Sequence, residues 1–452
     1  MEKLRQVDIR QYGILALPLA VAGLPLYLHA PDFYVTEQQL SLGLIGAILL
    51  LVRILDAVQD PLIGIFSDRL AARKPVILIG IAGLTVGLLG LFIPPVGAGP
   101  VWFATWIVLA TTSYSFISIN LNALGGIWSR DGFERTRIAT TRERFTLIGV
   151  TVGVVIPGVL TAQLGKPVAF TVFSLGMAVL LVWCGWQFVR WSRQHATLFE
   201  VRIKQAYKVH LTSIGGDQRI RRLMGVTLMG SLASALPAVL FLFFVRDQLG
   251  AENLSWLFLM LYFFAALAGI SLWRDLSRRQ GKVRTWCLTM LVAIACFIAA
   301  MFTGPGDLWL YGIVCLATGF ALGGDLIFPA SLLADYVGND DASRSTAGTG
   351  YAWLSFVQKA SLGVSAGVAF PFLHWIGFNT GSVNEPHALF GLVMLYAGVP
   401  LVLKLLAAWL AWSWRDSLEQ LVSHEENNHN LNNGRATDRG PDTNRMLQPN
   451  EN

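Results

Sequence analysis

Two aspartates lie four residues apart in the segment RILDAVQDPLIG, where most of their neighbours are apolar. In a helix this spacing places the carboxylates of Asp56 and Asp60 on one face, and Gln59 lies on the same side. Carboxylate and amide oxygens are hard ligands that suit Na⁺ or a proton. The segment therefore predicts a cation site, and the alternative is a structural ion pair of these acids with Arg53 or Arg142.

The composition shows what must surround these acids. Of 452 residues, 54% are hydrophobic and only 14% are charged. So few polar side chains cannot cover a water-soluble globule of this size, which excludes a soluble enzyme. We count twelve apolar runs long enough to cross a bilayer, near 12–29, 40–66, 76–95, 101–128, 145–163, 168–189, 223–246, 254–273, 286–303, 308–334, 346–376 and 388–414. The predicted fold class is an all-α membrane protein with twelve transmembrane helices.

Basic residues indicate the orientation of these helices. Nearly all Lys and Arg lie in the loops after even-numbered runs, whereas the opposite loops carry only Lys166 and Arg246. By the positive-inside rule, both termini face the cytoplasm, and the expected location is the cytoplasmic (inner) membrane. The net charge of +6 is then a topology signal, and we expect no nucleic-acid partner.

A basic stretch in the middle divides the chain. We predict a six-helix half at 1–189, a cytoplasmic linker at 190–222 and a second six-helix half at 223–414. Residues 415–452 are rich in Asn, Asp, Glu and Gly and are expected to form a disordered cytoplasmic tail. The four cysteines lie inside apolar runs and are expected to be core residues without disulfides.

An internal repeat points to a conformational gate. The loop GIFSDRLAARKP follows the second run, and ISLWRDLSRRQGKVR follows the eighth, so that Asp68 matches Asp275. An acid at a helix end can pair with neighbouring helix ends in one conformation and release them in another. We predict that Gly64, Asp68, Arg69 and Asp275 form this gate; the alternative is that both loops are ordinary topology signals.

Other charges within the apolar runs are also candidates, because ionisable groups at membrane depth are costly. Asp325 is flanked by glycines and Pro329, which predicts a broken helix and an acid turned toward a cavity. Lys359 is expected to pair with Asp56, Asp60 or Asp325. Lys404 is expected to extend to the interface without a functional role. No cluster of His residues and no Walker loop, nucleophile elbow or zinc pattern is present, so we expect no catalytic residues, no cofactor and no metal beyond Na⁺.

Several motifs resemble a known family. The residues Gly64, Asp68, Arg69, Arg73 and Lys74 are similar to the G-x-x-x-D-R-x-G-R-K loop of the major facilitator superfamily. LDAVQDPLIG resembles the pattern W-D-A-x-x-D-P-x-x-G in the second helix of the glycoside-pentoside-hexuronide:cation symporters, the melibiose permease family. ERTRIATTR, LLADYVGNDDASRSTAGTGY and the lysine in WLSFVQKASLG also agree, so the resemblance extends to about residue 414.

The resemblance implies a major facilitator fold of two six-helix halves around a cavity, and secondary active transport by alternating access. It implies that Ser115 helps Asp56, Gln59 and Asp60 to hold the cation, and that Arg142 borders the substrate cavity. The remaining substrate-binding or coupling candidates are Ser118, Asn122, Asp325 and Lys359.

The resemblance leaves the substrate open. Family members bind sugar with acids on the first and fourth helices, but here the first run has no acid, and the fourth has Ser118 and Asn122. The first candidate is symport of a sugar or related polar organic solute with Na⁺ or H⁺. The alternative is an amphipathic solute such as a lysolipid or fatty-acid derivative, and a membrane enzyme or receptor is the remote one. We expect a monomer in the lipid bilayer whose partner is a small-molecule substrate.

Overall fold

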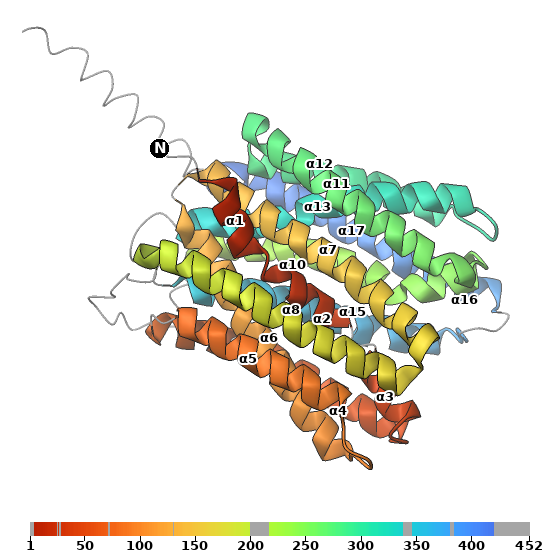
Figure 1. Ribbon diagram of the computed structural model, residues 1–452. Helices are drawn as coiled ribbons and strands as arrows, with labels where there is room; N and C mark the ends of the chain where they lie inside the picture. Colours follow the sequence, from red (N-terminus) through yellow and green to blue (C-terminus); the bar gives the residue numbers. More distant parts are fainter. Residues whose placement is uncertain are drawn as a thin grey trace, which may run out of the picture.

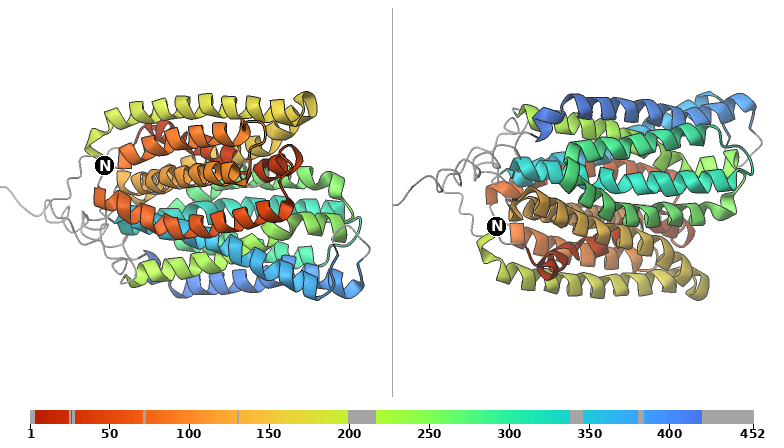
Figure 2. Two further views of the ribbon diagram at one scale, coloured as in Figure 1. Left: turned by 90° about the horizontal axis from the view of Figure 1, so that it is seen from below. Right: turned by 90° about the horizontal axis from the view of Figure 1, so that it is seen from above.

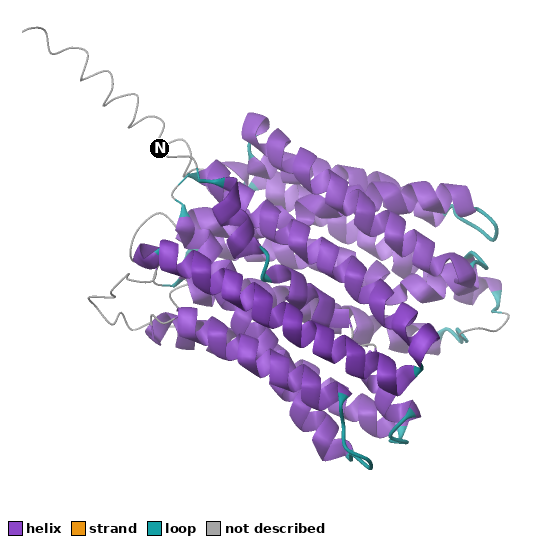
Figure 3. Ribbon diagram, viewed as in Figure 1, coloured by secondary structure: helices purple, strands orange, loops and turns teal. Residues whose placement is uncertain are grey.

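The computed structural model describes residues 4–24, 26, 29–70, 73–129, 131–198, 217–337, 346–379 and 384–419, and in these residues the regular structure is helical (Figure 3). The α-helices are α1 (Gln6–Gly13), α2 (Ala16–Leu24), α3 (Ala30–Thr36), α4 (Leu42–Leu70), α5 (Arg73–Phe92), α6 (Pro100–Trp128), α7 (Gly132–Leu164), α8 (Lys166–Gln194), α10 (Gln218–Phe243), α11 (Ser255–Gln280), α12 (Lys282–Met301), α13 (Leu308–Val337), α15 (Ala347–Trp375), α16 (Pro386–Val393) and α17 (Val399–Ser413).

The long helices lie side by side in one bundle (Figures 1 and 2). Within the described residues, 10 helical segments of 20 to 31 residues are long and apolar enough to cross a bilayer. Helix α4, with 29 residues, adds another crossing. The short helices α1 to α3 lie between residues 6 and 36, around the first predicted run at 12–29, and together form one more crossing. The predicted all-α membrane fold with twelve crossings is confirmed.

The first crossing is interrupted rather than continuous. Helix α1 ends at Gly13, and α2 begins at Ala16. Pro18 has no N–H with which to bond the carbonyl of Ile14, so a single helix cannot continue through this point without a lost hydrogen bond. The chain instead turns there, and the amide of Leu17 donates to the Ile14 carbonyl at 3.1 Å.

The fifth crossing begins much earlier than the predicted run at 145–163. Helix α7 starts at Gly132 because the Asp131 carboxylate accepts the backbone N–H groups of Phe133 (2.8 Å) and Glu134 (2.9 Å), which is an N-cap. The segment ERTRIATTR was expected to be a loop, and that expectation is wrong. Arg142 therefore lies inside a transmembrane helix, where its side chain has a fixed direction.

The predicted divisions of the chain are only partly within the described residues. Helix α8 continues to Gln194 and α10 begins at Gln218, so both enter the predicted linker at 190–222. Residues 199–216 of the linker and 420–452 of the predicted tail lie outside the described residues, and these divisions remain predictions. All four cysteines are buried free thiols, as expected.

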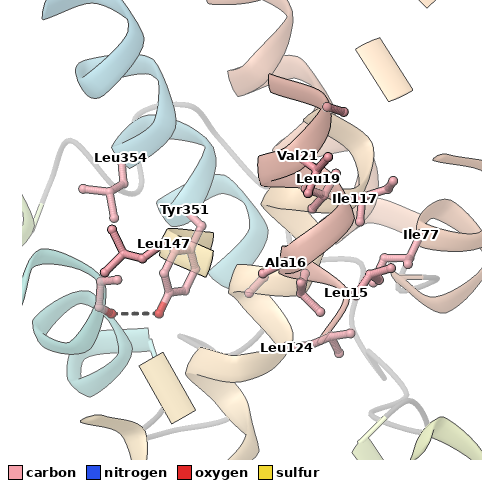
Figure 4. Close-up of a cluster of buried hydrophobic side chains, with 14 of the residues drawn as sticks. Leu15, Ala16, Leu19, Val21, Ile77, Ile117, Leu124, Leu147, Tyr351 and Leu354 are labelled. Atoms are coloured by element: carbon pink, nitrogen blue, oxygen red, sulfur yellow. Dashed lines mark hydrogen bonds between the residues drawn. The ribbon is translucent and has the colours of Figure 1, made fainter. Parts of the chain in front are cut away.

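A close contact between two helices and a cluster of apolar side chains position the helices that carry the candidate site. A Cβ atom on Gly64 of α4 would lie 2.7 Å from the Gly348 carbonyl oxygen of α15, so only glycine allows this contact. Leu15 and Leu19 belong to one buried apolar cluster with Ile77 of α5 and Ile117 of α6 (Figure 4). The glycine contact brings α4 of the first half directly against α15 of the second.

Candidate functional site

The acid pair lies on the buried face of α4. Asp56 is 3% exposed and Asp60 is 0% exposed, and α4 continues through Pro61 without a break. The ammonium of Lys359, on α15, lies 2.9 Å from Asp56 Oδ1 and 2.8 Å from Asp60 Oδ2. One lysine from the second half thus bridges both acids of the first half, whereas Arg142 pairs elsewhere.

Neutral side chains complete this charged cluster. Ser115 Oγ, on α6, lies 3.2 Å from Asp56 Oδ1 and 2.9 Å from the Lys359 ammonium. Gln59 donates to Asp56 Oδ1 at 3.1 Å. The structure therefore brings together the four predicted cation ligands and Lys359, which we name the coupling cluster: Asp56, Gln59, Asp60, Ser115 and Lys359.

Two hydroxyl groups at this cluster were missed in the sequence. Thr112 donates to Gln59 Oε1 at 2.9 Å, and Ser355 donates to Asp60 Oδ2 at 2.6 Å. The available signal was helical spacing, since Thr112 precedes Ser115 by three residues and Ser355 precedes Lys359 by four. These hydroxyls orient the side chains that hold the charge.

The charges of the cluster suit one additional cation. Among the residues of the coupling cluster, two carboxylates and one ammonium carry a formal charge of −1 when all are ionised, and a buried charge is costly unless it is compensated. A bound Na⁺ or a proton would neutralise that charge. The oxygen atoms of these carboxylates, the Gln59 amide and the Ser115 hydroxyl are suitable ligands for such an ion.

A cavity of about 230 Å³ adjoins the coupling cluster. Its polar lining comes from three helices: Tyr114, Ser118 and Asn122 on α6, Arg142, Glu143 and Thr146 on α7, and Ser355 and Gln358 on α15. Its apolar lining includes Leu19, Leu121, Leu326 and Leu354. Ser355 both lines the cavity and donates to Asp60, so it connects the two sites directly.

The cavity contains three of the predicted substrate-binding residues, Ser118, Asn122 and Arg142. The Arg142 guanidinium donates to Glu143 Oε1 through Nε at 3.0 Å and also through Nη2. Both side chains are buried. Glu143 was missed, because the residues before it were assigned to a cytoplasmic loop. The apolar runs at 12–29 and 101–128 carry no acid, as the sequence shows, whereas this buried acid lies on the fifth crossing.

Asp325 lies in a different environment from the predicted one. Helix α13 continues through Gly323, Gly324 and Pro329, so the expected break is wrong. A Cβ atom on Gly323 would lie 2.8 Å from the Ile270 backbone nitrogen, which means that the glycine permits close helix packing. The residues that line the cavity do not include Asp325.

Asp325, whose side chain is 18% exposed, instead forms an ion pair with the buried Lys404 of α17 and accepts a hydrogen bond from Trp286 Nε1 of α12 at 3.0 Å. The Lys404 side chain is 1% exposed, so the expectation that it extends to the interface is wrong. The carboxylate holds the ammonium inside the bundle because each charge would be costly to bury alone. This pair joins α12, α13 and α17 within the second half.

The C-terminal end of α4 and the N-terminal end of α15 are held together by Asp68. Its Oδ1 accepts the Gly348 N–H at 2.9 Å, and its Oδ2 accepts the N–H and hydroxyl of Thr349, both at 2.7 Å. Arg73 pairs with the same carboxylate at 2.6 Å. A carboxylate at the first turn of α15 also interacts favourably with the helix dipole.

Of the other predicted gate residues, Gly64 lies against Gly348 at this contact, whereas Arg69 and Asp275 are elsewhere. Arg69 is exposed, and Asp275 pairs with Arg274 on the surface, where its side chain is 60% exposed. The sequence repeat therefore does not produce two equivalent contacts. A further connection between the halves is made by Asp335 of α13, which lies 3.2 Å from Arg135 and 2.6 Å from Lys282.

Comparison with known proteins agrees with this architecture. Residues 11–415 match a family model described as MFS/sugar transport protein. The chain is 25% identical over 397 residues to the putative glycoside/cation symporter YagG of Escherichia coli (strain K12), covering 82% of this chain and 83% of that protein. It is 22% identical over 415 residues to the sodium-dependent lysophosphatidylcholine symporter 1-A of Danio rerio, covering 82% and 78%.

Solved structures support the same fold. A bacterial homologue of the iron transporter ferroportin, in an outward-facing state, has a TM-score of 0.68 at 16% identity and covers 91% of this chain and 100% of its own. The major facilitator superfamily proton:xylose symporter XylE has a TM-score of 0.63 at 13% identity, covering 90% and 94%. At these identities the similarity concerns the fold alone.

Proposed function

The chain belongs to the MFS/sugar transport protein family and has the major facilitator fold, and from this premise we propose that it is a cation-coupled symporter of a sugar or related polar organic solute. The coupling ion is Na⁺ or H⁺, and transport proceeds by alternating access. The observation that carries the proposal is the position of the coupling cluster, which shares Ser355 with a polar cavity.

Lys359 acts as an internal cation in this mechanism. Its ammonium bonds both acids, so an entering Na⁺ or proton must share these oxygens with it or displace it. Because Lys359 and Ser355 are on the same helix, displacement of the ammonium changes the wall of the solute cavity. Ion binding and solute binding therefore influence each other, as symport requires.

Alternating access requires the contact between the halves to open. Asp68 bonds the first turn of α15, and the same helix carries Lys359 further along. A rotation that separates α4 from α15 breaks the Asp68 contact and also moves Lys359 away from Asp56 and Asp60. The gate residues Gly64 and Asp68 therefore act on α4 and α15, the same two helices that carry the charged side chains of the coupling cluster.

An amphipathic solute is the second candidate. The similarity to proteins named lysophosphatidylcholine symporters and the apolar part of the cavity lining favour it. The volume of about 230 Å³ is below the roughly 300–1,000 Å³ of sites for drug-sized ligands, and the polar lining comes from three helices. These two properties favour a small polar solute.

We propose the remaining properties on the same basis. The protein is a multi-pass monomer in the cytoplasmic (inner) membrane with both termini in the cytoplasm. It carries out transport without catalysis, requires no cofactor other than the coupling ion, and has no nucleic-acid partner. Asp325 and Lys404 contribute to the stability of the second half rather than to substrate binding.

Thermal unfolding of the purified protein tests this function, since a ligand that binds the folded state raises its stability by mass action. We expect stabilisation by Na⁺ or by lowered pH, and further stabilisation by a monosaccharide or disaccharide that depends on that ion. Stabilisation by lysophosphatidylcholine and by no sugar would contradict the proposed substrate class and favour the amphipathic alternative.

A further inference from the structure

Glu143 has an oxygen atom that its partner does not use. Both hydrogen bonds from Arg142 end on Oε1. In the part of the chain that the structure describes, no side chain bonds Oε2, and this atom is not among the buried polar atoms that are enclosed without a partner. Since Glu143 lines the cavity, Oε2 is open to a solute.

The paired charges provide an acceptor and a donor next to each other. The carboxylate of Glu143 accepts hydrogen bonds only, and the guanidinium of Arg142 donates them only. Two hydroxyl groups on adjacent carbon atoms match this arrangement, because one can donate to Oε2 while the oxygen of the other accepts from Arg142. Ser118 and Asn122 line the same cavity from α6 and provide further polar contacts.

The same pair disfavours charged solutes. Arg142 and Glu143 together have no net formal charge, so the cavity attracts neither sign strongly. For an anionic group, attraction to the guanidinium is offset by repulsion from the carboxylate, and for a cationic group the two effects are reversed. A neutral polyhydroxy solute loses many hydrogen bonds to water on entry, and charged partners replace these bonds most effectively.

We propose that Glu143 is a specificity-determining residue that accepts a hydrogen bond from one hydroxyl group of a neutral sugar, while Arg142 donates to the neighbouring hydroxyl. This inference rests on the proposed sugar symport and adds the identity of the recognising acid. It also accounts for the absence of acids from the apolar runs at 12–29 and 101–128, because α7 supplies the carboxylate instead.

The experiment measures binding of D-glucose, D-galactose and their monodeoxy derivatives to the purified protein by thermal stabilisation and calorimetry. In the unmodified protein, removal of one particular hydroxyl should weaken binding roughly ten- to a hundred-fold, as expected for a hydrogen bond to a charged group. In Glu143→Gln that same removal should weaken binding about two-fold or less. A purely structural role of Glu143 would weaken all sugars equally and leave the difference between sugars unchanged.

Glu134→Gln is the matched control, because Glu134 is a buried acid on the same helix that bonds Arg137 away from the cavity. It should retain the deoxy-sugar profile of the unmodified protein. If Glu143→Gln does not fold, Glu143→Asp tests the same point, since shortening the side chain by one methylene should also reduce the difference.

An unchanged deoxy-sugar profile in a folded Glu143 variant would overturn the role of Glu143 and leave the proposed symport intact. Absence of binding by any sugar in the panel to the unmodified protein would overturn both. Loss of ion-dependent stabilisation in Asp60→Asn reports on the coupling cluster alone, so the two failures are distinguishable.

Discussion

At the scale of single residues, the molecule is organised by buried charges that are each placed next to a partner. Lys359 lies between Asp56 and Asp60, and Lys404 pairs with Asp325. Removing one partner of a buried ion pair typically costs about 3–5 kcal/mol, because the remaining charge is left without compensation. The two lysines differ in surroundings, since Lys359 adjoins a polar cavity and Lys404 is enclosed by helices.

Lys359→Ala should make the protein more dependent on its coupling ion. Without the ammonium, the two acids repel each other, so the melting temperature should fall in ion-free buffer and rise more on addition of Na⁺ or acid than in the unmodified protein. Lys166→Ala is the control, because Lys166 forms an exposed pair with Asp32 and such pairs contribute about 0–1 kcal/mol. An equal response of both variants to ions would argue against Lys359 as an internal cation.

At the scale of helices, the sequence could predict those properties that depend on residues close together in the chain. The four-residue spacing of Asp56 and Asp60 fixes a common face in any helix, so their proximity was predictable. The start of α7 was missed because apolar content was used to locate helices, and the N-cap at Asp131 was not considered. Glu143 was missed for the same reason, because it lies in the part of α7 that precedes the predicted run.

Tertiary contacts could not be predicted in the same way. The glycines beside Asp325 were interpreted as a break, but Gly323 lies against Ile270 and Gly324 against Thr289, and both of these residues are far away in sequence. Likewise, Asp68 and Asp275 occupy matching sequence positions, yet only Asp68 meets the end of another helix. A repeat in sequence therefore did not determine which copy forms the contact.

Gly64→Ala tests the contact between α4 and α15. The added Cβ would lie 2.6 Å from the Ala352 Cβ and 2.7 Å from the Gly348 carbonyl oxygen, and overpacking of this kind typically costs about 1–3 kcal/mol. The cytoplasmic side should therefore open more often. A cysteine at Ser331, which is buried beside Thr136, should react with a water-soluble thiol reagent roughly five-fold or more faster.

The control for this prediction is Gly46→Ala on the same helix, where an added Cβ meets no atom within 4 Å. It should leave the rate of labelling at Ser331→Cys unchanged. Equal labelling rates in Gly64→Ala and Gly46→Ala would mean that this close approach does not hold the cytoplasmic side closed.

At the scale of the whole molecule, two groups of helices meet along α4, α7, α13 and α15, and the charged contacts between them are concentrated in two places. The coupling cluster is in the interior, and the contacts of Asp68 and Asp335 are near the ends of the helices. Because both sets join the same halves, a movement that breaks one set also strains the other. This arrangement is what coupling of an ion to alternating access requires.

Membrane orientation is the prediction at this scale. Reporter enzymes fused after about residue 205 and at the C-terminus should be active only as cytoplasmic reporters, and a fusion after about residue 382 should be active only as an external one. The measurement is reporter activity in intact cells for fusions at these three positions, each made once with a cytoplasmic and once with an external reporter. A C-terminus outside the cytoplasm would be incompatible with twelve crossings from a cytoplasmic N-terminus.

Coupling by Asp56 and Asp60 is tested most directly by gradient-driven uptake in liposomes, with the Na⁺ and pH gradients varied separately and the best-binding sugar of the panel as substrate. Asp60→Asn keeps the shape of the side chain and removes one charge, so it should abolish accumulation while exchange of sugar across the membrane survives. Asp56→Asn should strongly raise the ion concentration needed. Full accumulation with unchanged ion dependence in both variants would contradict the coupling role and leave the carboxylates as structural partners of Lys359.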